Sequence, residues 1–247
     1  MALGNVVAIT RRLIYQLIRD RRTMALILIV PIVLMTLIRV SLPEERTLDY
    51  FAPAFLGTIA LFFVFLLTGI SFLRERSQGT MERLMASPVS RIDIVLGYFG
   101  GFSLFATAQS LIVLLFTIFV LQVQYQGALW QIFVFLIIIT GMALNLGIFV
   151  STFARTEFQV VQFIPLVIIP QVLLCGVFWP NEQMPAYLQY IAKVLPLSYA
   201  VDGLKGIMLE GETLLGVGLD LGVLVAFAVV LTVLGAVALR RGAAEYR

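Results

Sequence analysis

Long runs of apolar residues without a charged side chain alternate along the chain with short segments rich in arginine and glutamate. A helix needs roughly 20 apolar residues to cross a hydrocarbon core of about 30 Å, and the run from 94 to 154 is long enough for two such helices. No run shows the alternation of period two that marks a barrel strand. The pattern predicts an all-α membrane protein with a single transmembrane domain over 1–247. Its six membrane-spanning helices are expected at about 24–40, 50–73, 95–121, 130–153, 159–179 and 220–239.

Two further segments are amphipathic rather than uniformly apolar. Residues 5–22 place Val6, Ile9 and Leu13 on one helical face and arginines on the other, which is typical of a helix in the membrane interface with its arginines towards anionic headgroups. A plain basic anchor is the alternative. Residues 180–219 are too apolar for a solvated loop and repeat apolar residues at helical spacing. We expect two short outer helices there, either at the membrane surface or re-entrant.

The distribution of basic residues predicts the orientation in the membrane. With six spans, both termini and the 74–91 loop lie on one side. The other side keeps Arg39, Arg46, Lys193 and Lys205, so 13 of the 17 lysines and arginines are on the side of the termini. By the positive-inside rule, both termini are expected in the cytoplasm of a protein that crosses the cell membrane several times.

The composition excludes several kinds of chemistry. The chain has no histidine and a single cysteine, Cys175, which excludes Ser–His and Cys–His nucleophilic sites, histidine-ligated metals and an intrachain disulfide. The interiors of the predicted spans carry no charged residue, which argues against proton-coupled transport. No G-x-x-x-x-G-K-[ST] phosphate loop occurs. We therefore expect no catalytic residue, no metal, no cofactor bound by this chain and no nucleic-acid partner. An intramembrane enzyme is the weakest alternative.

The charged interruption between the second and third predicted spans, residues 74–91, reads "RERSQGTMERLMASPVSR". Met81, Leu84 and Met85 share one face of a short predicted helix, and Ser90 is placed to cap the next helix. A helix that shows a methionine-rich face beside charged residues predicts a docking site for a cytoplasmic protein. The alternative is a plain basic connector.

This run resembles the cytoplasmic loop of the type-2 permeases of ATP-binding-cassette (ABC) exporters, whose pattern is E-x-x-x-G-T-x-E-x-L-x-x-x-P. The segment "LPLSYAVDGLKGIMLEG" at 195–211 is similar to the family's L-P-L-[ST]-Y segment before the last span. The resemblance implies that the 74–88 loop is a coupling helix that sits in a cleft of an ATPase subunit. The residues that it assigns to ATPase coupling are Glu75, Gly79, Thr80, Glu82, Arg83, Leu84 and Pro88.

The resemblance further implies partners and an activity. Two permease chains, identical or paralogous, would work with two cytoplasmic ABC ATPase subunits that bind ATP and Mg²⁺. The machine would move a hydrophobic or amphipathic substrate, such as a drug, an antibiotic or a lipid-like molecule, out of the cytoplasm or inner leaflet by alternating access. Polysaccharide export is the alternative within the family. A membrane scaffold that transports nothing is the alternative outside it.

Uncharged polar residues inside the predicted spans are the candidates for a substrate pathway, because an aromatic cavity with a few amides suits an amphipathic substrate. Interhelical hydrogen bonding is the alternative role for each of them. The small residues Gly97, Gly101 and Gly147 allow close helix approach, either within the bundle or between two chains. The pathway candidates are Gln109, Asn145, Gln162 and Gln171.

Overall fold

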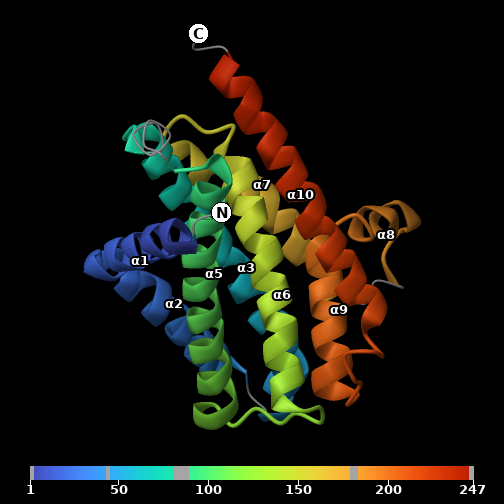
Figure 1. Ribbon diagram of the computed structural model, residues 1–247. Coiled ribbons are helices and arrows are strands. Elements are labelled where there is room, and N and C mark those ends of the chain that lie inside the picture. The colour runs from blue at the N-terminus through green and yellow to red at the C-terminus, as the bar shows by residue number, and fades with distance from the viewer. Residues whose placement is uncertain (1–2, 43–44, 81–88, 179–182, 245–247) are drawn as a thin grey trace.

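The computed structural model describes residues 3–42, 45–80, 89–178 and 183–244, and the regular structure in these ranges is helical throughout. The helices, labelled in Figure 1 apart from η1, are α1 (Leu3–Arg19), α2 (Arg21–Ser41), α3 (Glu45–Ser77), α5 (Arg91–Leu115), the π-helix η1 (Phe116–Val120), α6 (Leu129–Ser151), α7 (Glu157–Leu174), α8 (Ala186–Ala192), α9 (Pro196–Leu209) and α10 (Gly218–Ala244).

Six helices in the described ranges are long and apolar enough to cross a membrane, namely α2, α3, α5 with η1, α6, α7 and α10. This confirms the all-helical fold class and the six predicted spans. The ends differ from the predicted ones. α3 continues to Ser77, so the first residues of the predicted 74–91 loop are helical. α7 ends at Leu174, because the chain turns at Gly176, whose positive φ of 76° ends the helical path before residue 179.

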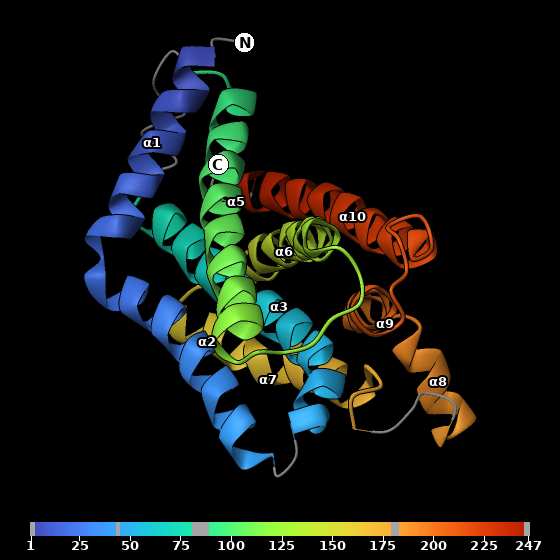
Figure 2. The same cartoon turned by 90° about the horizontal axis from the view of Figure 1, so that it is seen from below.

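α3 lies at the centre of the bundle. It contacts α2, α5, α6, α7 and α9, and Figure 2 shows it surrounded by these helices. In its most apolar stretch 72% of the residues are buried, against 17% in the corresponding stretches of α2, α7 and α10. The hydrophobic core is therefore built around α3, and the outer helices keep apolar faces exposed. In a membrane protein such faces contact lipid or another chain.

The amphipathic N-terminal segment is divided between two helices. α1 ends at Arg19 and α2 begins at Arg21, because the Asp20 side chain accepts a hydrogen bond from the backbone N–H of Thr23 and caps α2. Figure 1 shows α1 lying across the bundle rather than along it. Its buried residues, Ile9 and Leu13 among them, face α5, so the predicted apolar face of this helix is used for packing within the chain.

Glycines let helices approach closely in two places. A Cβ on Gly97 would lie 2.6 Å from Ile9 Cβ, and one on Gly101 would lie 2.7 Å from Leu13 Cδ2, so α1 rests directly on the α5 backbone. A Cβ on Gly147 of α6 would lie 2.7 Å from the carbonyl oxygen of Phe65 in α3. All three close approaches are therefore contacts within one chain.

The predicted outer helices are α8 and α9. α9 is largely buried against α3, α6 and α10, and the loop between η1 and α6 is tied to its end by a hydrogen bond from Gly127 N to Ile207 O of 3.1 Å. α8 projects from the side of the bundle (Figure 1). The positions of these helices relative to a membrane surface stay a prediction.

Candidate functional site

Three consecutive charged residues, Arg74, Glu75 and Arg76, lie in the last turn of α3, which ends at Ser77. They lie at the end of the bundle where α5 begins and α6 ends, towards the top of Figure 1. Successive residues of an α-helix are rotated by about 100°, so the three side chains leave α3 in different directions. We call residues 74–76 the charged turn. Each of its members contacts a different part of the chain.

Glu75 is the buried member of the charged turn, with 2% of its side chain exposed. Its Oε1 accepts a hydrogen bond of 2.8 Å from Gln16 Nε2, and its Oε2 accepts one of 2.6 Å from Arg12 Nη2. Tyr98 Oη also donates to Oε2. A buried carboxylate is tolerated only when it is paired and hydrogen-bonded, and these three donors meet that requirement. One carboxylate thus joins α1, α3 and α5.

Arg74 connects α3 to α7 and to the junction of α1 and α2. Its Nε and Nη2 donate to the two carboxylate oxygens of Glu157 at 3.0 and 3.2 Å, and its Nη1 lies 3.6 Å from Asp20 Oδ2. Hydrogen bonds from the hydroxyl and the backbone N–H of Thr23 lower the pKa of Asp20, and the Arg74 guanidinium acts in the same direction. These side chains are more than a third exposed, so the pairs position helices and add little stability.

Arg76 binds carbonyl groups at the C-terminal end of α6. Its Nη2 donates to the carbonyl oxygen of Ala154 at 2.7 Å and its Nη1 to that of Thr152 at 3.3 Å. The carbonyls at a helix C-terminus lack partners within the helix and carry a partial negative charge, so a guanidinium is favoured there. The charged turn therefore reaches α1, α5, α6, α7 and the start of α2.

The glycine of the family pattern ends α3. Gly79 has a φ of +66°, a conformation that residues with a side chain rarely adopt. The backbone N–H groups of Gln78 and Gly79 donate to the carbonyls of Arg74 and Arg76 at 3.0 and 3.2 Å, as in a glycine-terminated helix. The chain leaves α3 directly after the charged turn.

The structure describes part of the predicted coupling set. Glu75 points into the protein, so its contacts are within the chain, and Gly79 and Thr80 are half-buried. The α5 cap is confirmed, since Ser90 Oγ accepts a hydrogen bond of 3.1 Å from Asp93 N. The remaining predicted residues, Glu82, Arg83, Leu84 and Pro88, lie outside the described residues.

Two of the pathway candidates connect helices. Asn145 Nδ2 donates to Gly141 O at 2.9 Å within α6, and its Oδ1 lies 2.9 Å from Thr232 Oγ1 of α10. Gln171 Oε1 accepts a hydrogen bond of 3.3 Å from the backbone N–H of Leu197, which ties α7 to the first turn of α9. These contacts favour the alternative role of interhelical hydrogen bonding.

The other two candidates differ in exposure. Gln109 of α5 is buried, and its Nε2 donates to Ile27 O of α2 at 3.4 Å. Gln162 of α7 is exposed and lines an open groove with Phe153, Phe163 and Leu166. The four candidates therefore make separate contacts in different parts of the bundle. A role of any of them in a substrate pathway stays a prediction.

Sequence reasoning missed most partners of the charged turn. It assigned the arginines of residues 5–22, Arg12 among them, to the face turned towards lipid headgroups, and it gave no role to Tyr98 or Glu157. The available signal was a glutamate between two arginines at the end of an apolar run, because such a carboxylate borders the hydrophobic region and requires donors. Within the described ranges, no three histidine, cysteine, aspartate or glutamate side chains are arranged to hold a metal ion.

Six apolar helices, of which α2, α3, α5, α6 and α7 are linked at one end by the contacts of the charged turn, define a multi-pass helical membrane protein. The family model of the ABC-2 type transporters matches residues 4–209. The chain therefore belongs to the ABC-2 type transporter family.

Individual relatives agree with this assignment. The chain is 32% identical over 171 residues to a probable multidrug ABC transporter permease of Escherichia coli, covering 68% of this chain and 46% of the relative. It is 29% identical over 173 residues to a linearmycin resistance permease protein of Bacillus subtilis, covering 69% and 44%. It is 29% identical over 191 residues to the ABC transporter G family member 20 of Dictyostelium discoideum, covering 77% and 26%. The aligned regions span less than half the length of these relatives.

Proposed function

We propose that the chain is the membrane-spanning permease of an ATP-driven ABC exporter. Two permease chains, identical or paralogous, would act with two cytoplasmic ABC ATPase subunits that bind ATP and Mg²⁺. The proposed substrate is a hydrophobic or amphipathic molecule, such as a drug, an antibiotic or a lipid-like compound. Membership of the ABC-2 type transporter family supports the proposal, as do the relatives named for multidrug transport and linearmycin resistance.

The charged turn is the observation that carries this proposal. An exporter driven by a separate ATPase needs a connection between the docking loop and the helices that must move. Residues 74–76 are the first residues of the predicted docking loop, they are still helical, and they contact α1, α5, α6 and α7. A displacement of the loop would therefore move several helices together with α3, rather than bending α3 alone.

Rigid-body movement follows from this arrangement. α3 is the central helix, so a tilt imposed on its end is passed to the helices packed around it. In the proposed cycle, closure of the ATPases pushes on the loop after Ser77 and tilts the bundle against that of the second permease. This movement switches the substrate site between inward and outward access.

We infer that the charged turn faces the cytoplasm and that α8 and α9 lie on the outer side. The excess of arginine on the side of the termini supports this orientation. The outer helices would then form a lid over the pathway. α9 is suited to this role because it packs on α3, whose C-terminal end leads into the docking loop.

The proposal is tested by purifying the tagged chain from its native membranes in mild detergent and identifying the co-purifying proteins by mass spectrometry. We expect an ATPase with a phosphate-binding loop to accompany the unaltered chain and to be lost from, or depleted in, the variant Glu82→Arg. The matched control is Glu210→Arg, the same charge reversal on an exposed residue after α9, which should retain the ATPase. Recovery of the chain alone, or with a partner lacking ATPase motifs, would favour the non-transporting scaffold.

A further inference from the structure

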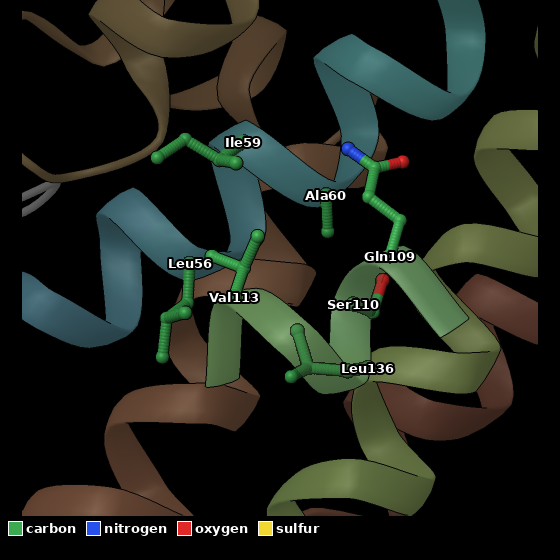
Figure 3. Close-up of a pocket in the computed structure, with 7 residues that line it drawn as sticks. All are labelled: Leu56, Ile59, Ala60, Gln109, Ser110, Val113 and Leu136. Atoms are coloured by element: carbon green, nitrogen blue, oxygen red, sulfur yellow. The ribbon is translucent and has the colours of Figure 1, made fainter. Parts of the chain in front are cut away.

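A small cavity lies where α3, α5 and α6 meet inside the bundle (Figure 3). Its walls are apolar side chains, with two exceptions on adjacent positions of α5, Gln109 and Ser110. The space open to the centre of a water-sized sphere is about 10 Å³. This is close to the minimum that admits one water molecule, and it is far too small for a transported substrate.

Ser110 differs from other buried hydroxyl residues of the spans. Thr68, Thr117 and Ser151 each donate to a backbone carbonyl three or four residues earlier, at 2.7, 2.8 and 2.6 Å. Ser110 is 4% exposed, yet its Oγ has no hydrogen-bond partner in the part of the chain that the structure describes. Its hydroxyl borders the cavity (Figure 3).

Gln109 supplies a second unpaired polar atom. Its side chain is 1% exposed and its Nε2 contacts Ile27 O, but its Oε1 has no partner among the described residues. An isolated amide oxygen or hydroxyl buried in an apolar environment is strongly unfavourable, and in the membrane interior bulk water does not relieve it. Both residues line the same small cavity, so a single molecule bound there is the candidate partner for the two unpaired atoms.

We propose that this cavity is a binding site for a single buried water molecule. The water donates one hydrogen bond to Gln109 Oε1 and makes a second with Ser110 Oγ, so both orphaned atoms are satisfied. Buried waters commonly bind where otherwise unsatisfied polar groups border a small cavity, and they form part of the structure. The site rests on the geometry of α3, α5 and α6 and is independent of the proposed transport function.

The proposal is tested first by the sign of a stability change. Ser110→Ala removes one anchor of the water and leaves Gln109 Oε1 poorly satisfied, so the thermal unfolding midpoint of the purified chain should fall by about 2–4 °C. The control Ser151→Ala removes a buried hydroxyl that bonds only within its own helix, and its shift should be smaller. In a dry cavity Ser110→Ala would delete an unsatisfied hydroxyl. An unchanged or higher midpoint therefore overturns the proposal.

The second test uses the unaltered chain and does not depend on the folding of a variant. A density map of the protein in lipid nanodiscs, at a resolution that shows ordered waters, should contain a peak about 3 Å from both Ser110 Oγ and Gln109 Oε1. A map that shows other buried waters but no peak in this cavity overturns the site.

Discussion

At the scale of single residues, the two partners of the Glu75–Arg12 ion pair differ in their exposure to solvent. Glu75 is 2% exposed, whereas Arg12 is 38% exposed and can be hydrated when it loses its partner. Arg12→Met should therefore cost about 3 kcal/mol of unfolding free energy, because it leaves a buried carboxylate with only Gln16 and Tyr98 as donors. Glu75→Gln should cost less, about 1.5 kcal/mol. Denaturant unfolding of the purified chain, followed by circular dichroism, measures both values.

The neighbouring arginine provides the control. Arg11 is exposed on the same helix, and Arg11→Met should change the unfolding free energy by no more than about 0.5 kcal/mol. If Arg11→Met and Arg12→Met were equally destabilising, the loss would come from removing a positive charge from α1 rather than from breaking the contact with Glu75. A double variant of Arg12 and Glu75 should lose less than the sum of the single losses, because the two side chains share one interaction.

The charged turn also shows how far residue-level sequence reasoning extends. The family pattern selected Glu75 and Gly79, and the backbone need for glycine at the end of α3 explains the second of them. It did not find the donors to Glu75. Arg12 and Gln16 are about sixty residues away along the chain, at separations of 63 and 59 positions, and only the packing of α1 on α5 brings them near.

At the scale of helices, close packing of α3 on α6 depends on Gly147. A Cβ at this position would lie 2.7 Å from the carbonyl oxygen of Phe65, and a backbone atom cannot rotate away. Gly147→Ala should therefore separate the two helices and reduce the unfolding free energy by about 1–3 kcal/mol. Thermal unfolding in detergent, monitored by the loss of the monodisperse species, measures the effect.

Gly141 is the matched control, because it lies on the same helix and a Cβ there would meet nothing within 4 Å. Gly141→Ala should be neutral or slightly stabilising, since alanine favours the helix more than glycine does. A loss in Gly141→Ala equal to that in Gly147→Ala would contradict the packing argument.

The helices themselves were largely predictable, and their ends were not. An uninterrupted apolar run of sufficient length predicts a span from composition alone, and all six were found in the described ranges. The ends depend on local hydrogen bonds that the apolar pattern does not contain. Asp20 caps α2 and so divides the N-terminal segment, and the charged turn stays helical because its side chains find partners on neighbouring helices.

At the scale of the whole molecule, the orientation in the membrane is open to direct measurement. Cys175 is the only cysteine, so Cys175→Ala provides a background without thiols. In that background, Gln124→Cys, between η1 and α6, should react with a membrane-impermeant maleimide in intact cells. Gln78→Cys, just after α3, should react only after the cells are permeabilised, because the basic side is retained in the cytoplasm.

Both positions are exposed in the structure, so burial within the protein would not prevent the labelling of either cysteine. Labelling of both variants by a membrane-permeant maleimide is the control. The opposite pattern, with Gln78→Cys labelled in intact cells, would invert the orientation and with it the proposed docking side.

The sequence by itself determined the six apolar helices, the side on which positive charge accumulates and the location of the family pattern. Each of these depends on the order of residue types along the chain, because the membrane thickness sets the length of a spanning helix and positive charge is retained on the cytoplasmic side. The tertiary structure alone decided which atoms meet. It showed that Gly97, Gly101 and Gly147 serve packing within the chain, and that Glu75 is buried among donors from α1 and α5. It also revealed that Gln109 and Ser110, which line one cavity, each carry an unpaired polar atom in the described part of the chain. Such contacts join residues far apart in the chain, and they exist only once the helices have packed.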